Sequence, residues 1–356
     1  METRSIRWGI VGCGQIAFDR ILPALELASN CETVALFDPD PERLARAHGK
    51  VPSAATYPSL AELLADPNVE AVYIATPNHL HSEQTVAAAA AGKHILVEKP
   101  MALDAAQGRH MVEAADRAGV KLMVAYMTLF NPIFQAAKRL VDSGALGEIV
   151  AMRGRHSYAM RSESLSDANR WRLDPRHGGG PLMDVGVYSI FTLRELTGIT
   201  PQSLVATGSV RRLHGKTDYD SIVFSYVGRD GTPGVVEASF TFGSSTYELE
   251  GTRGRLCLNG HITQLIGGTL EAELWPDFRP RRVSERISHE VVPAALPEFY
   301  NYLGEVTHFA SCILNDTTPL PSGASAITDL DVADAVRDSL RTGTRVELSS
   351  ERTVVG

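Results

Sequence analysis

The sequence predicts a two-domain α/β protein, with a parallel sheet in an N-terminal domain and a mostly antiparallel open sheet in a C-terminal α+β domain. Three observations support this prediction. The length of 356 residues suits two domains of about 150 residues each. Short apolar runs alternate with helix-like stretches in the first third of the chain, and period-two alternation dominates later segments. We place the boundary between domains 1–127 and 128–356.

Five short apolar runs are the expected strands of the N-terminal sheet. They are Ile6–Val11, Thr33–Phe37, Ala71–Ala75, His94–Val97 and Lys121–Ala125. Continuous apolar runs of this length are typical of strands that helices cover on both faces. Helices are expected between them, for example at Leu60–Leu64 and at Ala102–Arg117, where Gly119 supplies a C-terminal glycine.

The second domain is expected to begin with a helix from Pro132 to about Ser143. Alternating strands follow at Val205–Arg211, Ile222–Val227, Val235–Phe242 and Tyr247–Glu250, with turn signals at Asp230-Gly231 and Arg253-Gly254. Two helices close the chain; the first has a core-facing stripe made of Phe299, Tyr302, Val306, Phe309 and Ile313. Helices can cover only one face of such a sheet. We therefore expect a homodimer, or a dimer of dimers, joined through the other face.

Composition and charge exclude several classes of partner. The net charge of -8 gives no broad basic field for nucleic acid or an anionic membrane, so a small-molecule substrate is expected. The most apolar stretch, around Thr85–Ala91, is an alanine run far shorter than the roughly 20 residues of a membrane span. The segment Met1–Trp8 has no signal-peptide pattern, which predicts a cytoplasmic protein. Neither a disulfide framework nor a metal site is expected from the scattered cysteines, Cys13, Cys31, Cys257 and Cys312.

A glycine pattern joins the first strand to a helix. Gly12-Cys13-Gly14-Gln15-Ile16-Ala17 has the form G-x-G-x-x-A, in which the first glycine makes a tight turn and the second admits a pyrophosphate. Ala17 allows close packing of helix on strand, and the N–H groups of the helix start, around Gln15 and Ile16, can bind the phosphates. The pattern predicts a Rossmann dinucleotide-binding domain, although such turns also occur for structural reasons alone.

Asp38 follows the second strand, where an acidic side chain can accept hydrogen bonds from the adenosine ribose. This predicts NAD rather than NADP, because a carboxylate repels the 2′-phosphate. Two alternatives stay open. Asp38 precedes Pro39 in a strong turn sequence, and Arg43 and Arg46 could bind a phosphate.

Polar residues follow the third and fourth strands, at the sheet edge where open α/β folds bind ligands. We expect Thr76, Asn78, His81 and Glu98 to line the cofactor site, and we interpret His81 as a cofactor-edge or helix-capping residue rather than a metal ligand. Burial of Lys99 would lower its pKa and make it a hydrogen-bond donor or proton relay. A surface lysine at a loop entry is the alternative.

A second candidate site follows the glycines at 178–180. Pro181 suits the first helical position and Gly198 suits the helix end. Asp184 and Tyr188 are then four residues apart on one helical face. The carboxylate could orient the phenol, and a nearby lysine would lower the pKa of the phenol toward use as a general acid or base. A buried tyrosine with an N-terminal-turn aspartate is the alternative.

The chain resembles the glucose–fructose oxidoreductase, inositol dehydrogenase and rhizopine catabolism (Gfo/Idh/MocA) family. The resemblance covers nearly the whole chain and is carried by Gly12-x-Gly14-x-x-Ala17, Thr76-Pro77-Asn78, Glu98-Lys99-Pro100, Trp171-Arg172, Gly179-Gly180-x-x-x-Asp184-x-Gly186-x-Tyr188 and Gly251-Thr252-x-Gly254. It implies hydride transfer at a sugar or cyclitol carbon, with Lys99 as a catalytic and cofactor-contacting residue and with Trp171 and Arg172 near the substrate.

Two departures from the family pattern are informative. Many members, inositol dehydrogenases among them, have histidine where this chain has Tyr188, which makes inositol a less expected substrate. Leu129-Phe130 lacks the arginine that many relatives carry before the phenylalanine.

The resulting hypothesis is an NAD(P)-dependent dehydrogenase or reductase in which Lys99, Tyr188 and Asp184 act on the reacting oxygen. The alternative is a nucleotide-sensing regulatory protein of the same fold without turnover. The proton-transfer groups favour the enzyme, because a sensor could lose them and still bind the cofactor.

Overall fold

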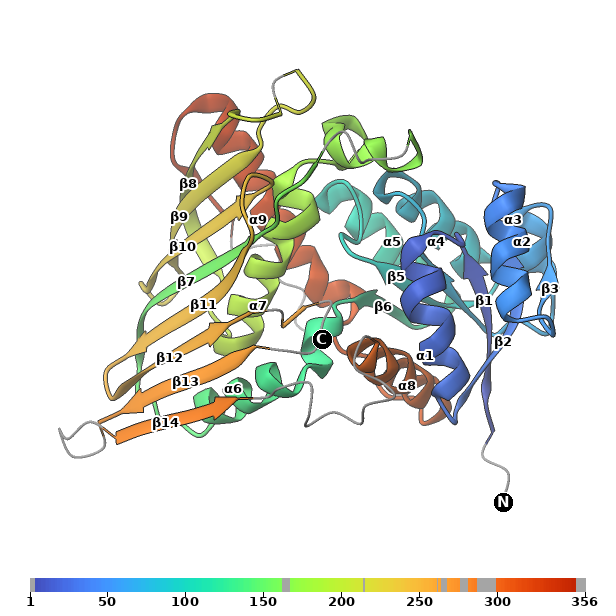
Figure 1. Ribbon diagram of the computed structural model, residues 1–356, viewed down its shortest axis with the longest axis horizontal. Coiled ribbons are helices and arrows are strands. Elements are labelled where there is room, and N and C mark those ends of the chain that lie inside the picture. Colours follow the sequence, from blue (N-terminus) through green and yellow to red (C-terminus); the bar gives the residue numbers. More distant parts are fainter. Residues whose placement is uncertain are drawn as a thin grey trace. The chain divides into compact units, whose positions relative to one another are not determined.

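The computed structural model describes residues 4–161, 167–213, 215–260, 262–263, 268–275, 281–286 and 299–349, which form two compact units (Figure 1). The first unit contains the described residues up to Phe130 and those from Phe299 to Ile327. The second contains those from Asn131 to Arg286 and from Thr328 onward. The sequence did not indicate that a segment after residue 298 belongs with the N-terminal sheet.

The first unit is built on a six-stranded, wholly parallel sheet with the order β3-β2-β1-β4-β5-β6. Its strands are β1 (Ile6–Val11), β2 (Cys31–Phe37), β3 (Ala55–Thr56), β4 (Ala71–Ile74), β5 (His94–Glu98) and β6 (Leu122–Ala125). The strands follow one another from β1 to β3 toward one edge of the sheet and from β4 to β6 toward the other, so the switch point lies between β1 and β4. In open α/β sheets, ligands bind at the carboxyl ends of the strands at such a switch point.

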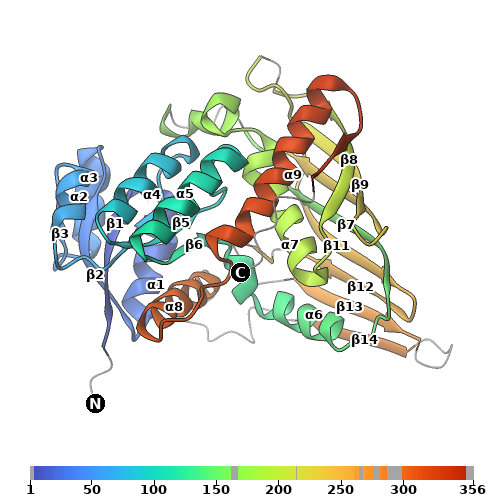
Figure 2. The same ribbon diagram turned by 180° about the vertical axis from the view of Figure 1, so that it is seen from behind.

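The sequence analysis located the five long strands of this sheet, with ends that differ by up to two residues. It missed β3, a strand of two exposed residues at the sheet edge. The apolar runs are strands because both faces are covered: β4 is buried at every position. Figures 1 and 2 show α1 and α8 against one face and α4 and α5 against the other.

Three helices of the first unit, α2, α3 and α5, start at residues that ordinary capping chemistry prefers. The side chains of Asp40, Ser59 and Asp104 each accept a backbone N–H at a helix start, and Gly119 ends α5 with φ +66°. The helical segments are η1 (Ala17–Ile21), α1 (Leu22–Leu27), α2 (Pro41–Lys50), α3 (Leu60–Ala65), η2 (Asn78–Leu80), α4 (His81–Ala90), α5 (Ala105–Ala118), η3 (Met127–Phe130) and α8 (Tyr300–Leu314).

The second unit is built on a sheet with the order β14-β13-β12-β11-β7-β10-β9-β8-β15, in which only β7 and β10 pair in parallel. The strands are β7 (Ile149–Ser157), β8 (Pro201–Ser209), β9 (Ser221–Gly228), β10 (Pro233–Ser239), β11 (Ser244–Gly251), β12 (Gly254–Asn259), β13 (Thr269–Leu274), β14 (Arg281–Arg286) and β15 (Val346–Glu347). The turn signals lie where hairpins form, between β9 and β10 and between β11 and β12.

Three helices lie along one face of this sheet in both views: α6 (Pro132–Asp142), α7 (Val187–Thr197) and α9 (Gly323–Thr342) (Figures 1 and 2). Short helical segments precede α7, namely η5 (Asp167–Leu173), η6 (Pro175–His177) and η7 (Leu182–Gly186). The opposite face carries the exposed residues of the alternating strands, as β9 shows with its pattern of buried and exposed positions.

Candidate active site

The glycine turn after β1 has the close packing and the open approach that a dinucleotide requires. Gly12 has φ +95°, and a Cβ there would lie 3.0 Å from the backbone of Ala75, so only glycine fits. A Cβ added at Gly14 would meet nothing within 4 Å, which leaves the backbone open to a ligand. No side chain caps the helix that follows, and Ala17 is fully buried at its start. These features fit a bound pyrophosphate.

The helix after the glycine turn differs from the expected form, because the π-helical segment η1 lies between the α-helical residues Gln15 and Ile16 and helix α1. Gln15 is exposed and Ile16 is half-buried at its beginning. Their backbone N–H groups are the ones that a helix start leaves without intrahelical partners.

Asp38 has a structural role that the sequence analysis had kept as an alternative. One carboxylate oxygen accepts the backbone N–H of Cys13 at 2.7 Å, and the other accepts that of Asp40 at 2.8 Å. The side chain therefore fixes the glycine turn as well as its own loop. Each carboxylate oxygen can accept a second hydrogen bond, so the same group can still receive a ribose hydroxyl.

The two arginines near Asp38 both have acidic neighbours. Arg43 Nε lies 3.3 Å from Asp40 Oδ2, and Arg46 Nη2 lies 3.9 Å from Asp19 Oδ1. Arg46 also stacks its guanidinium over the ring of Phe18, 3.6 Å from the ring centroid. These acids weaken the attraction that either arginine would offer a 2′-phosphate.

His81 connects the loops that follow β4 and β5. Its ring is fully buried, with Nε2 2.9 Å from the carbonyl oxygen of Thr76 and Nδ1 2.9 Å from that of Pro100. Burial lowers the pKa of His81 to about 4, so the neutral ring donates to one of the two carbonyls. The Thr76 hydroxyl donates to Gln84 Oε1 at 2.6 Å, and Asn78, two residues after Thr76, is buried. His81 thus joins the loop after β4 to the loop after β5.

Glu98 and Lys99 lie at the carboxyl end of β5 and are both buried. Glu98 Oε1 accepts the hydroxyl of Tyr73 at 2.7 Å, and Oε2 accepts the backbone N–H of Lys99 at 3.2 Å. Burial and the negative charge of Glu98 raise the pKa of Tyr73 well above its ordinary value, so the phenol remains a donor. The sequence analysis missed Tyr73, because it lies inside an apolar strand where a tyrosine is an ordinary core residue.

In the second unit, the glycine run at 178–180 packs against the turn that carries Trp171 and Arg172. A Cβ at Gly179 would lie 2.5 Å from the carbonyl oxygen of Trp171, a distance that no other residue could accept. Gly180 donates its N–H to the carbonyl oxygen of Arg172 at 2.8 Å. The glycines therefore set the position of Arg172.

Asp184 is the centre of a polar cluster in the second unit. Its Oδ1 accepts from Arg172 Nη1 at 2.9 Å and its Oδ2 accepts the hydroxyl of Tyr158 at 2.7 Å, while the carboxylate is only 7% exposed. Burial and Asp184 raise the pKa of Tyr158 well above its ordinary value. Sequence reasoning missed Tyr158. The signal that could have found it is the alternation that places His156 and Tyr158 on the same side of the chain at the end of β7.

The helix carrying Asp184 and Tyr188 differs from the predicted one. Residues 182–186 form the π-helical segment η7, and the α-helix α7 begins only at Val187, so the four-residue spacing does not follow an α-helical face. Asp184 instead directs its carboxylate to Arg172 and Tyr158. Tyr188 is 1% exposed, and its ring centroid lies 5.1 Å from that of His156.

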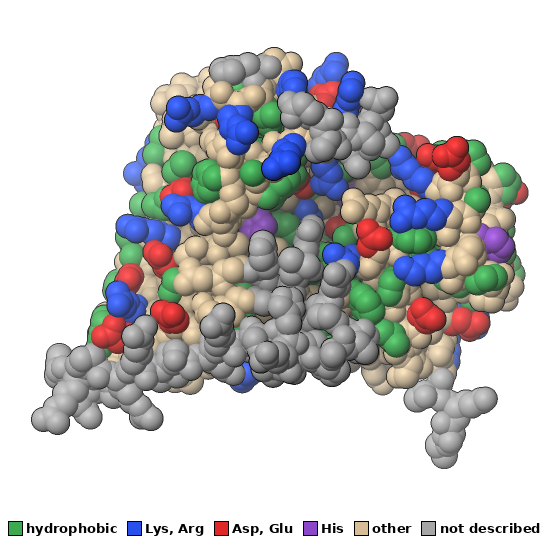
Figure 3. Space-filling model, viewed as in Figure 1, with side chains coloured by type: hydrophobic (Ala, Val, Ile, Leu, Met, Phe, Trp, Pro, Cys, Tyr) green, Lys and Arg blue, Asp and Glu red, His purple; other side chains and the backbone are tan. Residues whose placement is uncertain are grey.

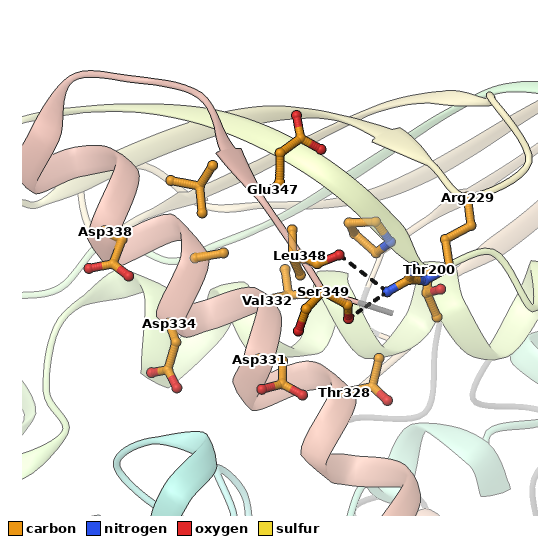
Figure 4. Close-up of a pocket in the computed structure, with 13 residues that line it drawn as sticks. Thr200, Arg229, Thr328, Asp331, Val332, Asp334, Asp338, Glu347, Leu348 and Ser349 are labelled. Atoms are coloured by element: carbon orange, nitrogen blue, oxygen red, sulfur yellow. Dashed lines mark hydrogen bonds between the residues drawn. The ribbon is translucent and has the colours of Figure 1, made fainter. Parts of the chain in front are cut away.

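A separate groove of about 270 Å³ lies in the second unit, between α9 and the segment around β15 (Figure 4). Arg229 donates to the carbonyl oxygens of Leu348 and Ser349 there, and α9 contributes acidic side chains such as Asp331. None of the predicted site residues lines this groove. The candidate active-site residues are therefore those at the carboxyl ends of β1, β4 and β5 in the first unit and those around Asp184 in the second unit.

The described residues lack the features of two other kinds of site. They contain no group of three or more His, Cys, Asp or Glu side chains placed to hold a metal ion. Every helix in the ranges given above is too short or too polar to cross a bilayer.

The strand order, the glycine turn and the polar cluster around Asp184 together define a two-domain oxidoreductase that uses a nicotinamide nucleotide. Residues 6–126 match the model of the oxidoreductase family with an NAD-binding Rossmann fold, and residues 134–257 match the GFO/IDH/MocA C-terminal domain. The chain belongs to the Gfo/Idh/MocA family and is an NAD(P)-dependent oxidoreductase acting on CH–OH groups.

Known relatives include enzymes with different cofactors. The chain is 31% identical to D-xylose 1-dehydrogenase (NADP(+)) 2 of Haloferax volcanii, over 96% of this chain and 99% of that one. It is 27% identical to scyllo-inositol 2-dehydrogenase (NAD(+)) of Bacillus subtilis, over 99% and 98%. The crystal structure of aldose-aldose oxidoreductase from Caulobacter crescentus, complexed with glycerol, superposes with a TM-score of 0.84 at 28% identity, covering 97% of this chain and 100% of that one. The comparisons give no support to the regulatory alternative.

Proposed function

We propose that this protein transfers a hydride between NAD(H) and a hydroxyl-bearing carbon of a sugar or sugar-like polyol. The observation that carries the proposal is the cluster around Asp184, which holds a carboxylate between Arg172 and Tyr158 one helical turn before Tyr188. A nucleotide sensor would not need such a cluster. The names of the relatives, which act on xylose, inositol or aldoses, support the substrate class.

In the proposed chemistry, Lys99, Asp184 and Tyr188 act on one reacting oxygen. The nicotinamide, when bound, supplies or accepts the hydride. In oxidation Tyr188, as the phenolate, accepts the proton of the substrate hydroxyl, and in reduction the phenol returns that proton to the carbonyl oxygen. Lys99 stabilises the negative charge that develops on this oxygen. Asp184, held by Arg172, positions the hydroxyl group.

The cofactor preference is proposed to be NAD over NADP. Asp38 supports this, because its carboxylate lies at the end of β2 and the neighbouring arginines already have acidic partners. The 2′-phosphate of NADP would meet a negative charge there, and both neighbouring arginines lie beside acidic side chains.

The protein is further proposed to be a homodimer, or a dimer of dimers, joined through the uncovered face of the large sheet. That face exposes Val205, Val223 and Val227 beside the ion pair of Arg155 with Glu237. Apolar side chains edged by paired charges are typical of an interface between protein subunits.

The mixture of acidic and basic side chains in Figure 3 offers no continuous basic surface on the face that it shows. All four cysteines have free thiols, which supports a reducing cytoplasm as the location.

The deciding experiment is a substrate screen with the purified protein. Aldoses, anhydrosugars, polyols and inositols are each incubated with NAD⁺ or NADP⁺, and the corresponding ketones with the reduced cofactors, while the absorbance of the reduced nicotinamide is followed. We expect turnover with at least one sugar, faster with NAD(H), and its loss in Tyr188→Phe. Tight cofactor binding without turnover on any of these substrates would favour the regulatory alternative.

A further inference from the structure

A buried aspartate, Asp220, lies directly before β9 in the second unit, outside the polar cluster around Asp184. Asp220 is 0% exposed, and its Oδ2 accepts the backbone N–H groups of three consecutive residues: Arg211 at 2.9 Å, Arg212 at 2.6 Å and Leu213 at 3.1 Å. Three N–H groups that converge on one oxygen form a site for an anion. Burial alone would raise the pKa of Asp220, but these hydrogen bonds outweigh it and lower the pKa, so the group is a carboxylate at neutral pH.

The sheet fixes the place of Asp220 itself. Its backbone N–H donates to the carbonyl oxygen of Ser209, at the end of β8, at 3.0 Å. Its carbonyl oxygen accepts the N–H of Phe240 at 2.8 Å and the hydroxyl of Ser239 at 3.2 Å. The carboxylate is therefore held between β8 and the end of β10, and it ties residues 211–213, the 211–213 turn, to the sheet.

Leu213 joins this turn to the candidate active site. Its side chain is 3% exposed and belongs to the same buried apolar cluster as Leu173 and Val185. Leu173 directly follows Arg172, and Val185 directly follows Asp184. The ion pair between Arg172 and Asp184, with Nη1 2.9 Å from Oδ1, is thus carried by two segments that share a core with the 211–213 turn.

A second path leads from Asp220 to the same ion pair. Phe240, whose N–H donates to Asp220, places its ring centroid 5.2 Å from that of Tyr158. Tyr158 in turn donates its hydroxyl to Asp184 at 2.7 Å. Displacement of Asp220 or of the chain around it would therefore reach Asp184 through an aromatic contact as well as through the apolar cluster.

The rest of the β8–β9 connection faces the segment that carries Arg172. A hollow of about 460 Å³ has residues 173–176 among its lining on one side and residues 215–218 on the other. A Cβ added at Gly180 would lie 3.8 Å from Thr217 Oγ1, and Gly180 donates its N–H to the carbonyl oxygen of Arg172. The connection thus forms a wall against this segment.

We propose that Asp220 is a positioning residue: its carboxylate fixes the 211–213 turn, and this turn holds the segments of Arg172 and Asp184 so that their ion pair keeps its geometry. The proposal rests on the proposed function only for the part that Asp184 plays toward the substrate. Without the carboxylate, three backbone N–H groups lose their acceptor, and the turn that packs Leu213 into the cluster is released.

The anchoring step is tested without substrate or cofactor. In hydrogen exchange followed by mass spectrometry, the amides of residues 211–213 should be protected in the unaltered protein. In Asp220→Asn they should exchange at least about tenfold faster, because a neutral amide oxygen is a weaker acceptor than a carboxylate. Rapid exchange of these amides in the unaltered protein would overturn the proposal, even if the variant failed to fold.

The effect on the segment of Arg172 is also measured without substrate. The guanidinium carbon of Arg172 lies 4.8 Å from the centroid of the Trp171 ring, so this ring reports on the segment. In protein labelled with 5-fluorotryptophan, the ¹⁹F resonance of Trp171 is assigned by its loss in Trp171→Phe. It should move in Asp220→Asn and in Leu213→Ala, which removes the packing but keeps the carboxylate. An unmoved resonance in both variants would overturn the proposal.

Turnover separates positioning from a general structural role. Asp220→Asn should lower kcat/KM by about tenfold or more, because small displacements of a positioning group are costly. In an Arg172→Gln background the same substitution should cost less than about twofold, because the ion pair through which Asp220 acts is already gone. An equal loss in both backgrounds would overturn the positioning claim.

Asp230→Asn is the matched control, because Asp230 also fixes a turn, at the other end of β9. Its Oδ1 accepts the N–H of Thr232 at 3.0 Å, and its Oδ2 accepts the hydroxyl of the same residue at 2.8 Å. The variant should keep kcat/KM within about twofold and leave the Trp171 resonance in place. A shift of that resonance as large as in Asp220→Asn would overturn the proposal. If no substrate turns over, the proposed function fails, while amide exchange and the ¹⁹F resonance still decide the role of Asp220.

Discussion

Replacing Tyr158 with phenylalanine removes the hydroxyl that donates to Asp184 Oδ2 at 2.7 Å and changes little else in the packing. A hydrogen bond to a charged acceptor contributes about 1.5–3 kcal/mol. Asp184 keeps its ion pair with Arg172, so the carboxylate stays in place but is free to rotate about that contact. If Asp184 positions the reacting hydroxyl, the loss should appear as a fall of about 10- to 150-fold in kcat/KM. Steady-state kinetics with the best substrate of the screen measures it.

Tyr57→Phe is the matched control for this change. Tyr57 donates to Asp66 at 2.6 Å in the first unit, so the substitution removes the same kind of hydrogen bond from a half-buried place outside the polar cluster around Asp184. It should leave kcat/KM unchanged. Cofactor affinity should be normal in both variants. A normal kcat/KM in Tyr158→Phe would refute the reasoning, because it would show that the phenol does not help to hold Asp184 for catalysis.

Three further outcomes follow from the contacts described above. Asp38→Ser should narrow or reverse the preference for NAD(H) over NADP(H), as measured by fluorescence titration. It should also lower thermal stability, because the backbone N–H groups of Cys13 and Asp40 lose their acceptor. Equal or better binding of NADP(H) by the unaltered protein would contradict the role of Asp38. The hydrogen bond from Tyr57 lowers the pKa of Asp66, so this pair stabilises the fold above the unfolded pKa of about 3.9 and loses its effect as pH falls through the folded value. In Tyr57→Phe, the free energy of unfolding measured with urea should therefore fall less steeply as the pH is lowered. An unchanged dependence on pH would argue against the role of this pair. Sedimentation should show a dimer or tetramer at micromolar concentration that Val223→Lys weakens, whereas a monomeric unaltered protein would exclude the sheet-face interface.

Much of the fold could be predicted from the sequence, because its strands and turns follow local rules. The parallel strands are continuous apolar runs between helices, and the hairpins of the second sheet form at Asp230-Gly231 and beside Arg253-Gly254. The return of α8 to the first unit could not be predicted in this way. Its apolar stripe indicates only that one face is buried, and the stripe carries no information about which sheet covers it.

The candidate site was predictable where glycine or a charged residue interrupts an apolar pattern, as at Gly12, Lys99 and Asp184. It was not predictable where a polar residue looks like ordinary core. Tyr73 lies in a strand whose pattern is otherwise apolar, and its role depends on a long-range hydrogen bond to Glu98. The π-helical turns η1 and η7 were also missed, since no residue in them differs from a normal α-helix start.

The most direct test of the central claim is a double-mutant cycle on Lys99 and Tyr188, because the account requires both groups to act on the same oxygen. Lys99→Met and Tyr188→Phe should each lower kcat by about 100-fold or more. Cofactor binding should survive Tyr188→Phe, and the double variant should lose much less than the product of the single losses, because groups that act as a unit are not additive. Near-normal turnover in Tyr188→Phe would contradict the account and would leave Lys99 or a water molecule as the proton carrier.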